Sequence, residues 1–449
     1  MATIPSPVTL TNASADVLNA IRNQASNNYR DYVPIATPDA ESVRQIGAVI
    51  MDYPELQNEF VSALINRIAI VVVTSKTYRN PWAVFKRGVL DFGESIEEIF
   101  VDIAKVETYN PADAENTLYK RYIPNIRSAF HVLNYEKFYP VTISDAELRK
   151  AFTSYEGVND LIARIVNSLY SAMNYDEYMT MKYMLARKIL AGMVTPVAIS
   201  DVTDSKTVVK AVKGIVNKMR FMSDKYNIAR VKTFSNPDEQ YILLDTQFDA
   251  NMDIDVLATA FNLDKAEFIG RRVLIDGFGN LDADRLAELF ANDANYTPLT
   301  NAEIEALNTI PCAIVDKDFF MIYDNLLQFR EDYNGKGLYW NEFLHAWKTF
   351  SVSPFANAAV AVAGEPGVTS VSISAPNSAV AGSTVHATAN VVTTNFAPKT
   401  VDWTVSPETC SVDAAGNVTI PSGVTGAVTV TATSVYDAEK SATHTITSA

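Results

Sequence analysis

Two hydrophobic patterns divide this chain of 449 residues near Glu365. Beyond that residue apolar and polar positions alternate with a period of two, which is typical of strands that bury one face. Glycines and prolines separate the alternating runs, as expected for short turns. The runs lie at Val368–Ile373, Thr384–Ala389, Val401–Val405, Val418–Ile420 and Val428–Ala432. Residues 367–449 are therefore predicted to form an all-β sandwich.

The composition of this C-terminal segment also differs from that of the preceding chain. No Leu, Met or Arg occurs from Glu365 to Ala449, although all three are common before it. Within one alternating run, Val401, Trp403 and Val405 fall on the same face of the predicted strand. We therefore predict a separate domain whose core is anchored by Trp403, with Val401 and Val405 beside it.

The clearest helical signal before Glu365 begins at Ser144. Ser144 and Glu147 have the spacing of a capping box, in which the hydroxyl and the carboxylate each bond a free backbone amide. From Val158 onward apolar residues recur at helical spacing, and Gly192 provides a stop. An unbroken helix here would be roughly 50 Å long. Residues 144–192 are therefore predicted to form a spine against which strands pack.

The remaining body combines strands and helices, which predicts an α+β fold. Residues 1–55 contain five prolines between short helical patches and are predicted to form an arm without a packed core. The aliphatic run Ile68–Val73 is predicted to be a buried strand. Residues 74–142 are predicted to form long strands joined by a loop, residues 193–311 a mixed α/β region, and residues 312–363 strands that return to the spine.

Size and charge limit the possible classes of protein. At roughly 150 residues per domain the chain should contain two or three domains. Its net charge of −15 repels the phosphate backbone, so a protein that tracks nucleic acid is disfavoured, although DNA could be enclosed without being gripped. Neither a secretory signal nor a membrane span is visible, so we predict no membrane partner. Cys312 and Cys410 are predicted to be free thiols.

No motif predicts catalysis, a cofactor or a metal site. Gly277–Gly279 lacks the other residues of a phosphate-binding loop and is interpreted as a turn. The string Asp249, Asp253 and Asp255 lacks the central Gly and the final Glu of a calcium loop. The pair Glu97–Glu98 carries little information among 52 carboxylates. Surface or packing roles are predicted for the four scattered histidines, which are His131, His345, His386 and His444.

The C-terminal segment resembles bacterial Ig-like group 2 repeats. The resemblance rests, in order along the chain, on Val380–Ala389, Thr400–Val405, Val412–Val418 and Gly426–Ser434. Such modules bind or decorate surfaces in adhesins, secreted enzymes and phage virions. The C-terminal segment therefore does not decide the function by itself.

The body resembles the major capsid proteins of Bacillus phage phi-29 and its relatives, and the resemblance extends over essentially the whole chain. It is carried most strongly by Val315–Asn325, Gly337–Asn341 and Ser351–Asn357. Further similar segments follow in the same order, at Asp16–Asn23, Tyr32–Thr37, Gly93–Ile99, Asp176–Met179, Asp253–Ala258 and Val273–Phe278. Residues 280–311 look longer than the corresponding stretch of the family, which suggests an inserted loop.

The resemblance implies a capsid fold of the Hong Kong 97 type. It assigns residues 1–55 to an N-terminal arm, 74–142 to an extended loop, 193–311 to an axial domain, and 144–192 with 312–363 to a peripheral domain. It also implies hexamers and pentamers that close into an icosahedral shell around the double-stranded DNA of a tailed phage, assembled in the host cytoplasm. The implied partners are copies of the chain, a scaffolding protein and a portal, with the Ig-like domain outermost on the virion.

One cluster in the predicted extended loop is a candidate contact site. Trp82, Phe85, Lys86 and Arg87 combine aromatic and basic groups, which are typical of interface anchors. The alternative is a locally packed hairpin with a solvated Lys-Arg tip. Because an extended loop of this fold lies across a neighbouring subunit, the resemblance favours an intersubunit contact.

Two other classes of function remain open from the residues. A cell-surface adhesin or structural protein would explain the Ig-like segment, but it would need a secretion signal. An enzyme with an Ig-like accessory domain would need a catalytic constellation, and none is recognisable. The sequence therefore favours the capsid interpretation, without enzymatic activity.

Overall fold

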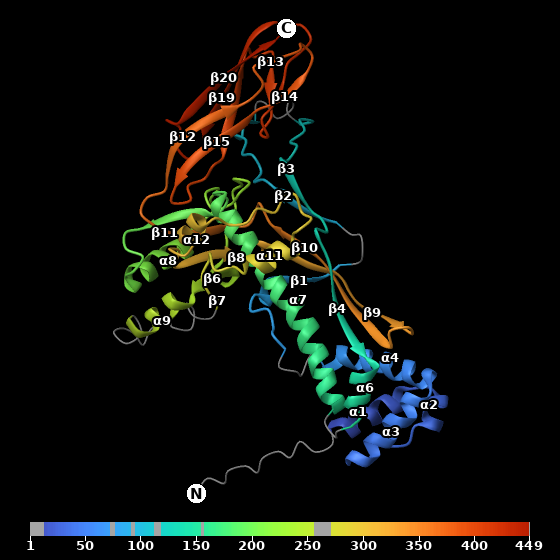
Figure 1. The fold of residues 1–449 in the computed structure, drawn as a ribbon. Coiled ribbons are helices and arrows are strands. Elements are labelled where there is room, and N and C mark those ends of the chain that lie inside the picture. Colours follow the sequence, from blue (N-terminus) through green and yellow to red (C-terminus); the bar gives the residue numbers. More distant parts are fainter. Residues whose placement is uncertain are drawn as a thin grey trace. The chain divides into compact units, whose positions relative to one another are not determined.

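The chain folds into two compact units, shown with their helices and strands in Figure 1. The computed structural model describes residues 13–71, 77–90, 95–111, 118–153, 157–255 and 271–448. The first unit consists of residues 1–95, 132–178 and 322–350, and the second of residues 96–131, 179–321 and 351–449. Both units contain helices and strands, which confirms the predicted α+β class.

The first unit combines helices with a four-stranded sheet of order β1-β9-β10-β4. Strand β1 runs parallel to β9, and β10 pairs with β4 in an antiparallel register from Tyr339 opposite Ser144 to Lys348 opposite Tyr135. The strands are β1 (Lys86–Val89), β4 (Tyr135–Ser144), β9 (Phe320–Asn334) and β10 (Tyr339–Val352). The helices are α1 (Ala13–Gln24), α2 (Asn27–Tyr32), α3 (Ala40–Asp52), α4 (Pro54–Val71), α6 (Asp145–Ala151) and α7 (Gly157–Leu190).

The predicted spine is confirmed by α6 and α7. Ser144 and Glu147 make the reciprocal capping box in front of α6. Helix α7 has 34 residues, which corresponds to about 51 Å of helix. Gly192 follows it with a φ of +68°, a conformation that glycine adopts without strain. Among the described helices, none has both the length and the apolar character needed to cross a bilayer.

The prediction of an arm without a core over residues 1–55 is wrong for the described part. Helix α3 buries Val43, Ile46 and Ile50 in the same hydrophobic core as α7. Asp39 caps this helix by accepting a hydrogen bond from the Ser42 amide. The prolines of this region separate the helices, and Pro54 is the first residue of α4, where proline fits well. They mark boundaries between packed helices and do not indicate an unpacked chain.

The prediction of a strand at Ile68–Val73 is also wrong, because α4 extends to Val71. The last two residues of that run lie outside the described residues. A short aliphatic run has the same appearance in a buried strand and in a buried helix, so periodicity could not separate them.

The second unit contains a five-stranded sheet of order β5-β11-β8-β6-β7. Strand β11 pairs in parallel with β5 and antiparallel with β8, and all five residues of β8 are buried. Cys312 in β8 and Cys410 are free, as predicted, and both are buried. The strands are β5 (Thr195–Ile199), β6 (Gln240–Asp245), β7 (Arg272–Ile275), β8 (Cys312–Asp316) and β11 (Ala358–Ala363). The helices of this region are α8 (Ser205–Met219), α9 (Thr246–Asp255), α11 (Ala283–Leu289) and α12 (Asn301–Leu307).

The C-terminal segment consists of strands and turns, as its period of two predicts. Its largest sheet has the order β13-β20-β19-β16. Trp403 and Val405 of β16 are partly buried and pack against a core made by other strands, whereas Val401 is partly buried at the start of β16. The strands are β12 (Gly367–Ser374), β13 (Ser378–Ala379), β14 (Thr384–His386), β15 (Thr388–Thr394), β16 (Val401–Ser406), β17 (Ser411–Val412), β18 (Asn417–Thr419), β19 (Gly426–Ser434) and β20 (Ser441–Ser448).

Candidate subunit interface

The four residues predicted as interface anchors have different environments in the first unit. Trp82 is fully buried, and its ring meets the rings of Phe85 at 5.9 Å and Tyr178 of α7 at 5.6 Å, both edge-on. Phe85 is buried as well, whereas Lys86 is half-buried and Arg87 is exposed. The two aromatic side chains are therefore out of reach of another copy, and for them the alternative of local packing fits the structure. Contact through Lys86 and Arg87 stays a prediction.

Lys86 belongs to an ionic cluster of two lysines and two carboxylates. Its Nζ lies 3.1 Å from Glu177 Oε2 and 2.7 Å from Asp324 Oδ2. Lys348 Nζ lies 2.7 Å from Asp324 Oδ1 and also pairs with Glu177. Asn80 donates to the second oxygen of Glu177 at 2.6 Å. The cluster therefore joins β1, α7, β9 and β10.

The charges of this cluster compensate one another in a buried site. Burial opposes the charge on Lys86, but the carboxylates of Glu177 and Asp324 outweigh it and raise the pKa of Lys86. Burial also opposes the charge on Asp324, but Lys348 and Lys86 outweigh it and lower the pKa of that carboxyl. These shifts favour the charged forms of Lys86 and Asp324, and removal of one charge from the cluster would leave another without its partner.

The exposed apolar surface lies on a different segment, the hairpin of β2 (Ile96–Val101) and β3 (Ile126–His131) in the second unit. The strands are antiparallel, with Ile99 opposite Ser128 and Val101 opposite Ile126. Because alternate residues of a strand point to opposite faces, one face of the hairpin carries Ile99, Val101, Ile126 and Phe130. Each of these four side chains is more than half exposed.

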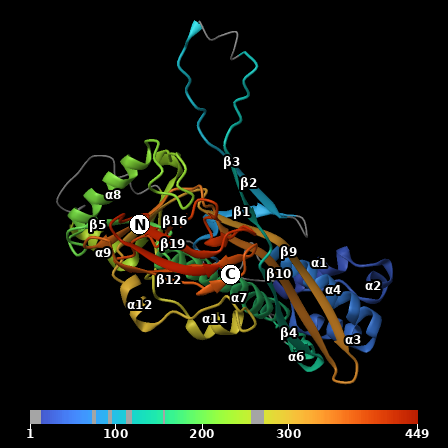
Figure 2. The same ribbon diagram turned by 90° about the horizontal axis from the view of Figure 1, so that it is seen from above.

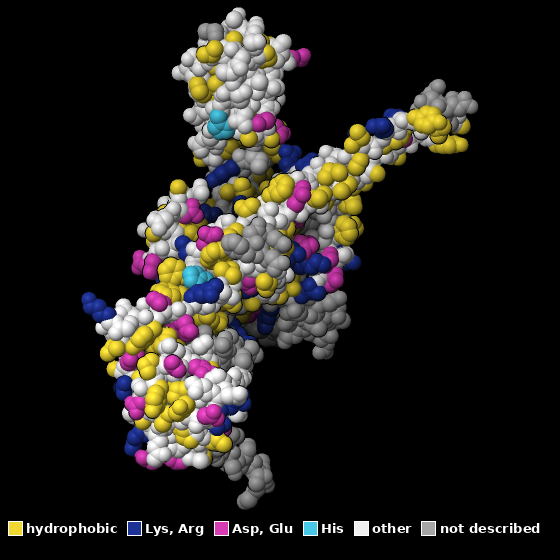
Figure 3. All heavy atoms as spheres, turned by 90° about the vertical axis from the view of Figure 1, so that its right-hand side faces the viewer, with side chains coloured by type: hydrophobic (Ala, Val, Ile, Leu, Met, Phe, Trp, Pro, Cys, Tyr) yellow, Lys and Arg dark blue, Asp and Glu magenta, His cyan; other side chains and the backbone are white. Residues whose placement is uncertain are grey.

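Beyond the two strands the hairpin continues as extended chain, which Figure 2 shows reaching past the other elements of its unit. Glu107 and Lys120 form an ion pair of 3.0 Å across it. Figure 3 shows hydrophobic side chains gathered along this segment. Val106 is 95% exposed and Tyr119 is 90% exposed, and Tyr109, Leu118 and Ile123 are also largely exposed. Exposed apolar patches of this kind are typical of surfaces that bind another protein.

Residue types alone directed the prediction to Trp82 and Phe85, which the fold buries. The abundance of Tyr between residues 74 and 142 is also typical of contact surfaces. The sequence does not show that Trp82 is buried and Val106 exposed, because Tyr178, which packs against Trp82, lies far along the chain in α7. Accessibility of each side chain is the missing information, and it follows only from the fold.

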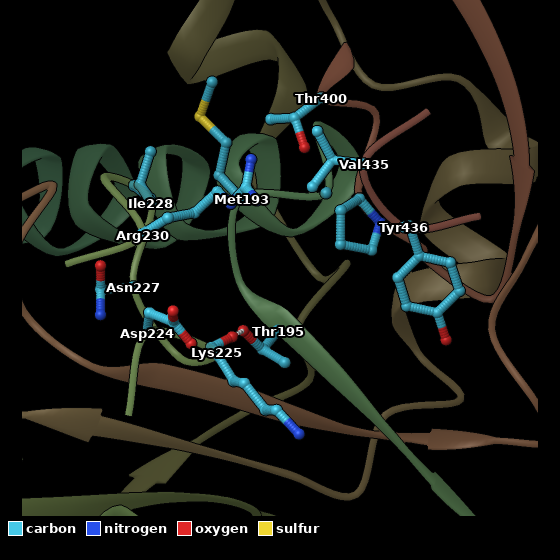
Figure 4. Close-up of a pocket in the computed structure, with 12 residues that line it drawn as sticks. Met193, Thr195, Asp224, Lys225, Asn227, Ile228, Arg230, Thr400, Val435 and Tyr436 are labelled. Atoms are coloured by element: carbon cyan, nitrogen blue, oxygen red, sulfur yellow. Dashed lines mark hydrogen bonds between the residues drawn. The ribbon is translucent and has the colours of Figure 1, made fainter. Parts of the chain in front are cut away.

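A cavity of about 530 Å³ in the second unit offers a different kind of site. Figure 4 shows Met193, Asp224 and Arg230 on one part of its lining and Thr400 and Tyr436 on another. This lining contains neither His nor Cys, and its single carboxylate is that of Asp224. Within the described part of the chain, no three His, Cys, Asp or Glu side chains gather as a metal site would require.

Comparison with known proteins identifies the family of the chain that carries this exposed hairpin. A model of the family described as Phi29-like phage major capsid protein matches residues 18–362. The chain belongs to this family. The capsid protein is 35% identical over 434 residues to the major capsid protein of Bacillus phage B103, covering 94% of this chain and 90% of the relative. It is 35% identical over 404 residues to that of Bacillus phage PZA, covering 87% and 83%.

A solved structure is also similar to the capsid protein. The capsid structure of Staphylococcus phage Andhra matches with a TM-score of 0.52 and 14% identity, covering 65% of this chain and 86% of that chain. At this identity the likeness concerns the fold alone, and it confirms the predicted Hong Kong 97 type. The capsid protein is thus a virion component that assembles into the phage capsid shell, as the resemblance implied.

Proposed function

We propose that the capsid protein forms hexamers and pentamers that close into an icosahedral shell around double-stranded DNA, each copy docking its β2–β3 hairpin on a neighbour. The observation that carries this is the row of exposed apolar side chains from Ile99 to Phe130. A two-stranded hairpin is marginally stable by itself, so it gains stability when another surface covers it. Repeated over a closed shell, modest contacts of this kind add by symmetry and multivalency.

The other partners follow from this role. A subunit charge of −15 repels phosphate, which suits a shell that encloses DNA without gripping it. A scaffolding protein would set the curvature, and a portal would occupy one vertex. We assign no enzymatic activity to the chain. Among the described residues, His131 is hydrogen-bonded to both a serine and a carboxylate, but its ring is buried.

Replacing Val106 with Asp should raise the protein concentration needed for shell formation by about tenfold or more. The substitution puts a charge on an apolar contact that is desolvated on assembly. Light scattering during assembly, followed by negative-stain electron microscopy, measures this. Val380→Asp is the matched control, since Val380 is also an exposed valine but lies in the C-terminal segment. Equal assembly by both variants would contradict docking through the hairpin.

The C-terminal segment is proposed to be an Ig-like module on the outer surface of the shell, where it bridges or decorates capsomers. Support comes from its order of strands and turns, from the motif segments around Trp403, and from a core of its own that includes Val418, Val428 and Ile446. A domain with its own core can be added to a shell protein without altering the fold of the body.

Deleting residues 366–449 should give particles that still assemble but are less stable. The physical reason is that the module adds contacts around capsomers while the hairpin supplies the contacts that close the shell. Thermal disruption of purified shells, compared with full-length shells at the same protein concentration, measures the difference. Failure of the deletion variant to form any particle, with its body still folded, would place the module among the essential contacts.

A further inference from the structure

The inner face of the β2–β3 hairpin carries a network of hydrogen bonds at its root, formed by Glu98, His131, Ser351 and Ser353. Ser353 Oγ donates to Glu98 Oε1 at 2.7 Å. The other oxygen, Glu98 Oε2, lies 3.1 Å from His131 Nε2, and His131 Nδ1 lies 2.7 Å from Ser351 Oγ. Both oxygens of one carboxylate and both nitrogens of a ring that is 2% exposed are therefore engaged. We call these four residues the root network.

The root network connects segments that are far apart along the chain. Glu98 is on β2 and His131 ends β3, whereas Ser351 lies near the end of β10 and Ser353 just beyond it. Ser353 Oγ also accepts hydrogen bonds from the backbone amides of Phe355 and Ala356. The serine that binds Glu98 is therefore itself fixed in position by the backbone. The hairpin thus leaves its unit from a fixed point.

Two further contacts also attach the inner face of the hairpin to its unit. The ring of Phe100 stacks on that of Phe355 at 5.4 Å with an angle of 22°. Arg127 donates to the backbone oxygen of Ala229 at 2.7 Å. Alternation along β2 thus separates two roles, because Glu98 and Phe100 face the root while Ile99 and Val101 face outward. Contacts of the inner face therefore bear on the direction of the apolar outer face.

We propose that Glu98, with His131 and Ser353, is a positioning residue for shell assembly. The root network fixes the direction in which the hairpin presents its apolar face. In this way it sets the geometry between neighbouring subunits. The inference rests on the proposed docking of the hairpin and adds the residues that control it. A small change of angle at the root moves the end of a long hairpin by a much larger distance. The uniformity of curvature therefore depends on this network.

A serine, a histidine and a carboxylate in hydrogen-bond contact can also form a hydrolytic site. Here His131 is buried, and the Glu98 oxygen that does not face the ring is occupied by Ser353. A substrate would have to displace the hairpin to reach the imidazole. The hydrogen bonds that would orient a catalytic base here join three segments of backbone instead. This favours a role in positioning the hairpin over a role in catalysis.

The test compares Glu98→Gln with Glu97→Gln. Glu97 is the next residue on the same strand and is exposed, so its variant removes the same charge from the opposite face. In isolated subunits, amide hydrogen exchange over residues 97–101 and 126–130 should become about tenfold or more faster in Glu98→Gln only. The thermal unfolding midpoint should remain close to wild type in both variants, because the network lies outside the main cores.

In assembly, Glu98→Gln should give shells with a broader distribution of diameters than wild type. Equal exchange rates in the two variants, or wild-type diameters for Glu98→Gln, would overturn the proposal. If Glu98→Gln does not fold, Ser353→Ala replaces it in the test, because this variant removes the hydrogen bond from Ser353 to Glu98. If wild type forms no shells, the proposed function fails, and the exchange comparison on subunits still decides the role of the root network.

Discussion

Replacing Lys348 with Met should lower the free energy of unfolding of the capsid protein by about 3–5 kcal/mol, which is the usual cost of breaking a buried ion pair from one side. The Lys348 side chain is 3% exposed and that of Glu177 is 1% exposed. Without Lys348, two carboxylates share the single cation of Lys86. Methionine fills a similar volume, so the loss arises from the charge and not from a cavity.

Urea unfolding of isolated subunits, followed by circular dichroism, measures this loss. Lys150→Met is the control, because Lys150 is an exposed lysine of the same unit and its replacement should change stability by less than about 0.5 kcal/mol. The double variant Lys348→Met with Glu177→Leu should recover part of the loss, since it removes the carboxylate that the single variant leaves without a partner. Equal losses from Lys348→Met and Lys150→Met would contradict a buried ionic cluster.

Local features of the sequence predicted the parts of this fold that depend on neighbouring residues. The capping box at Ser144, the helix ending before Gly192 and the strand Val401–Val405 are each determined within a few residues, and all three appear in the structure. Prediction failed where the partner is distant. Ile68 lies on a helix although a strand was predicted. The prediction failed because a short aliphatic run is equally typical of a strand and of a helix.

The candidate site shows the same limit more strongly. The buried Trp82 packs edge-on against Tyr178, and no spacing rule links residues 96 positions apart. Glu98 differs from Glu97 only in which side of β2 it occupies, and on that side it meets Ser353 and His131. A pair of adjacent glutamates was uninformative in the sequence, whereas the fold gives its two members opposite environments.

Glu342 on β10 should make the first unit less stable as the pH rises. It is 1% exposed, and neither oxygen of its carboxyl has a hydrogen-bond partner among the described residues. Burial, assisted by the nearby Glu331, raises its pKa from an ordinary value of 4.5 to about 8. A raised carboxyl pKa means that folding favours the protonated form. The contribution of Glu342 to stability is therefore greatest below pH 4.5, falls between pH 4.5 and pH 8, and is constant above that range.

Glu342→Gln should remove this dependence, because the amide keeps the size of the side chain and cannot ionise. The variant should be more stable than wild type by on the order of 4 kcal/mol at pH 9 and nearly equal to it at pH 4. Urea unfolding at a series of pH values measures the difference. Glu136→Gln, an exposed glutamate of the same sheet, should leave the profile of wild type unchanged. A parallel profile for Glu342→Gln would mean that the carboxyl is already paired or solvated, since only an isolated buried acid makes folding oppose its ionisation.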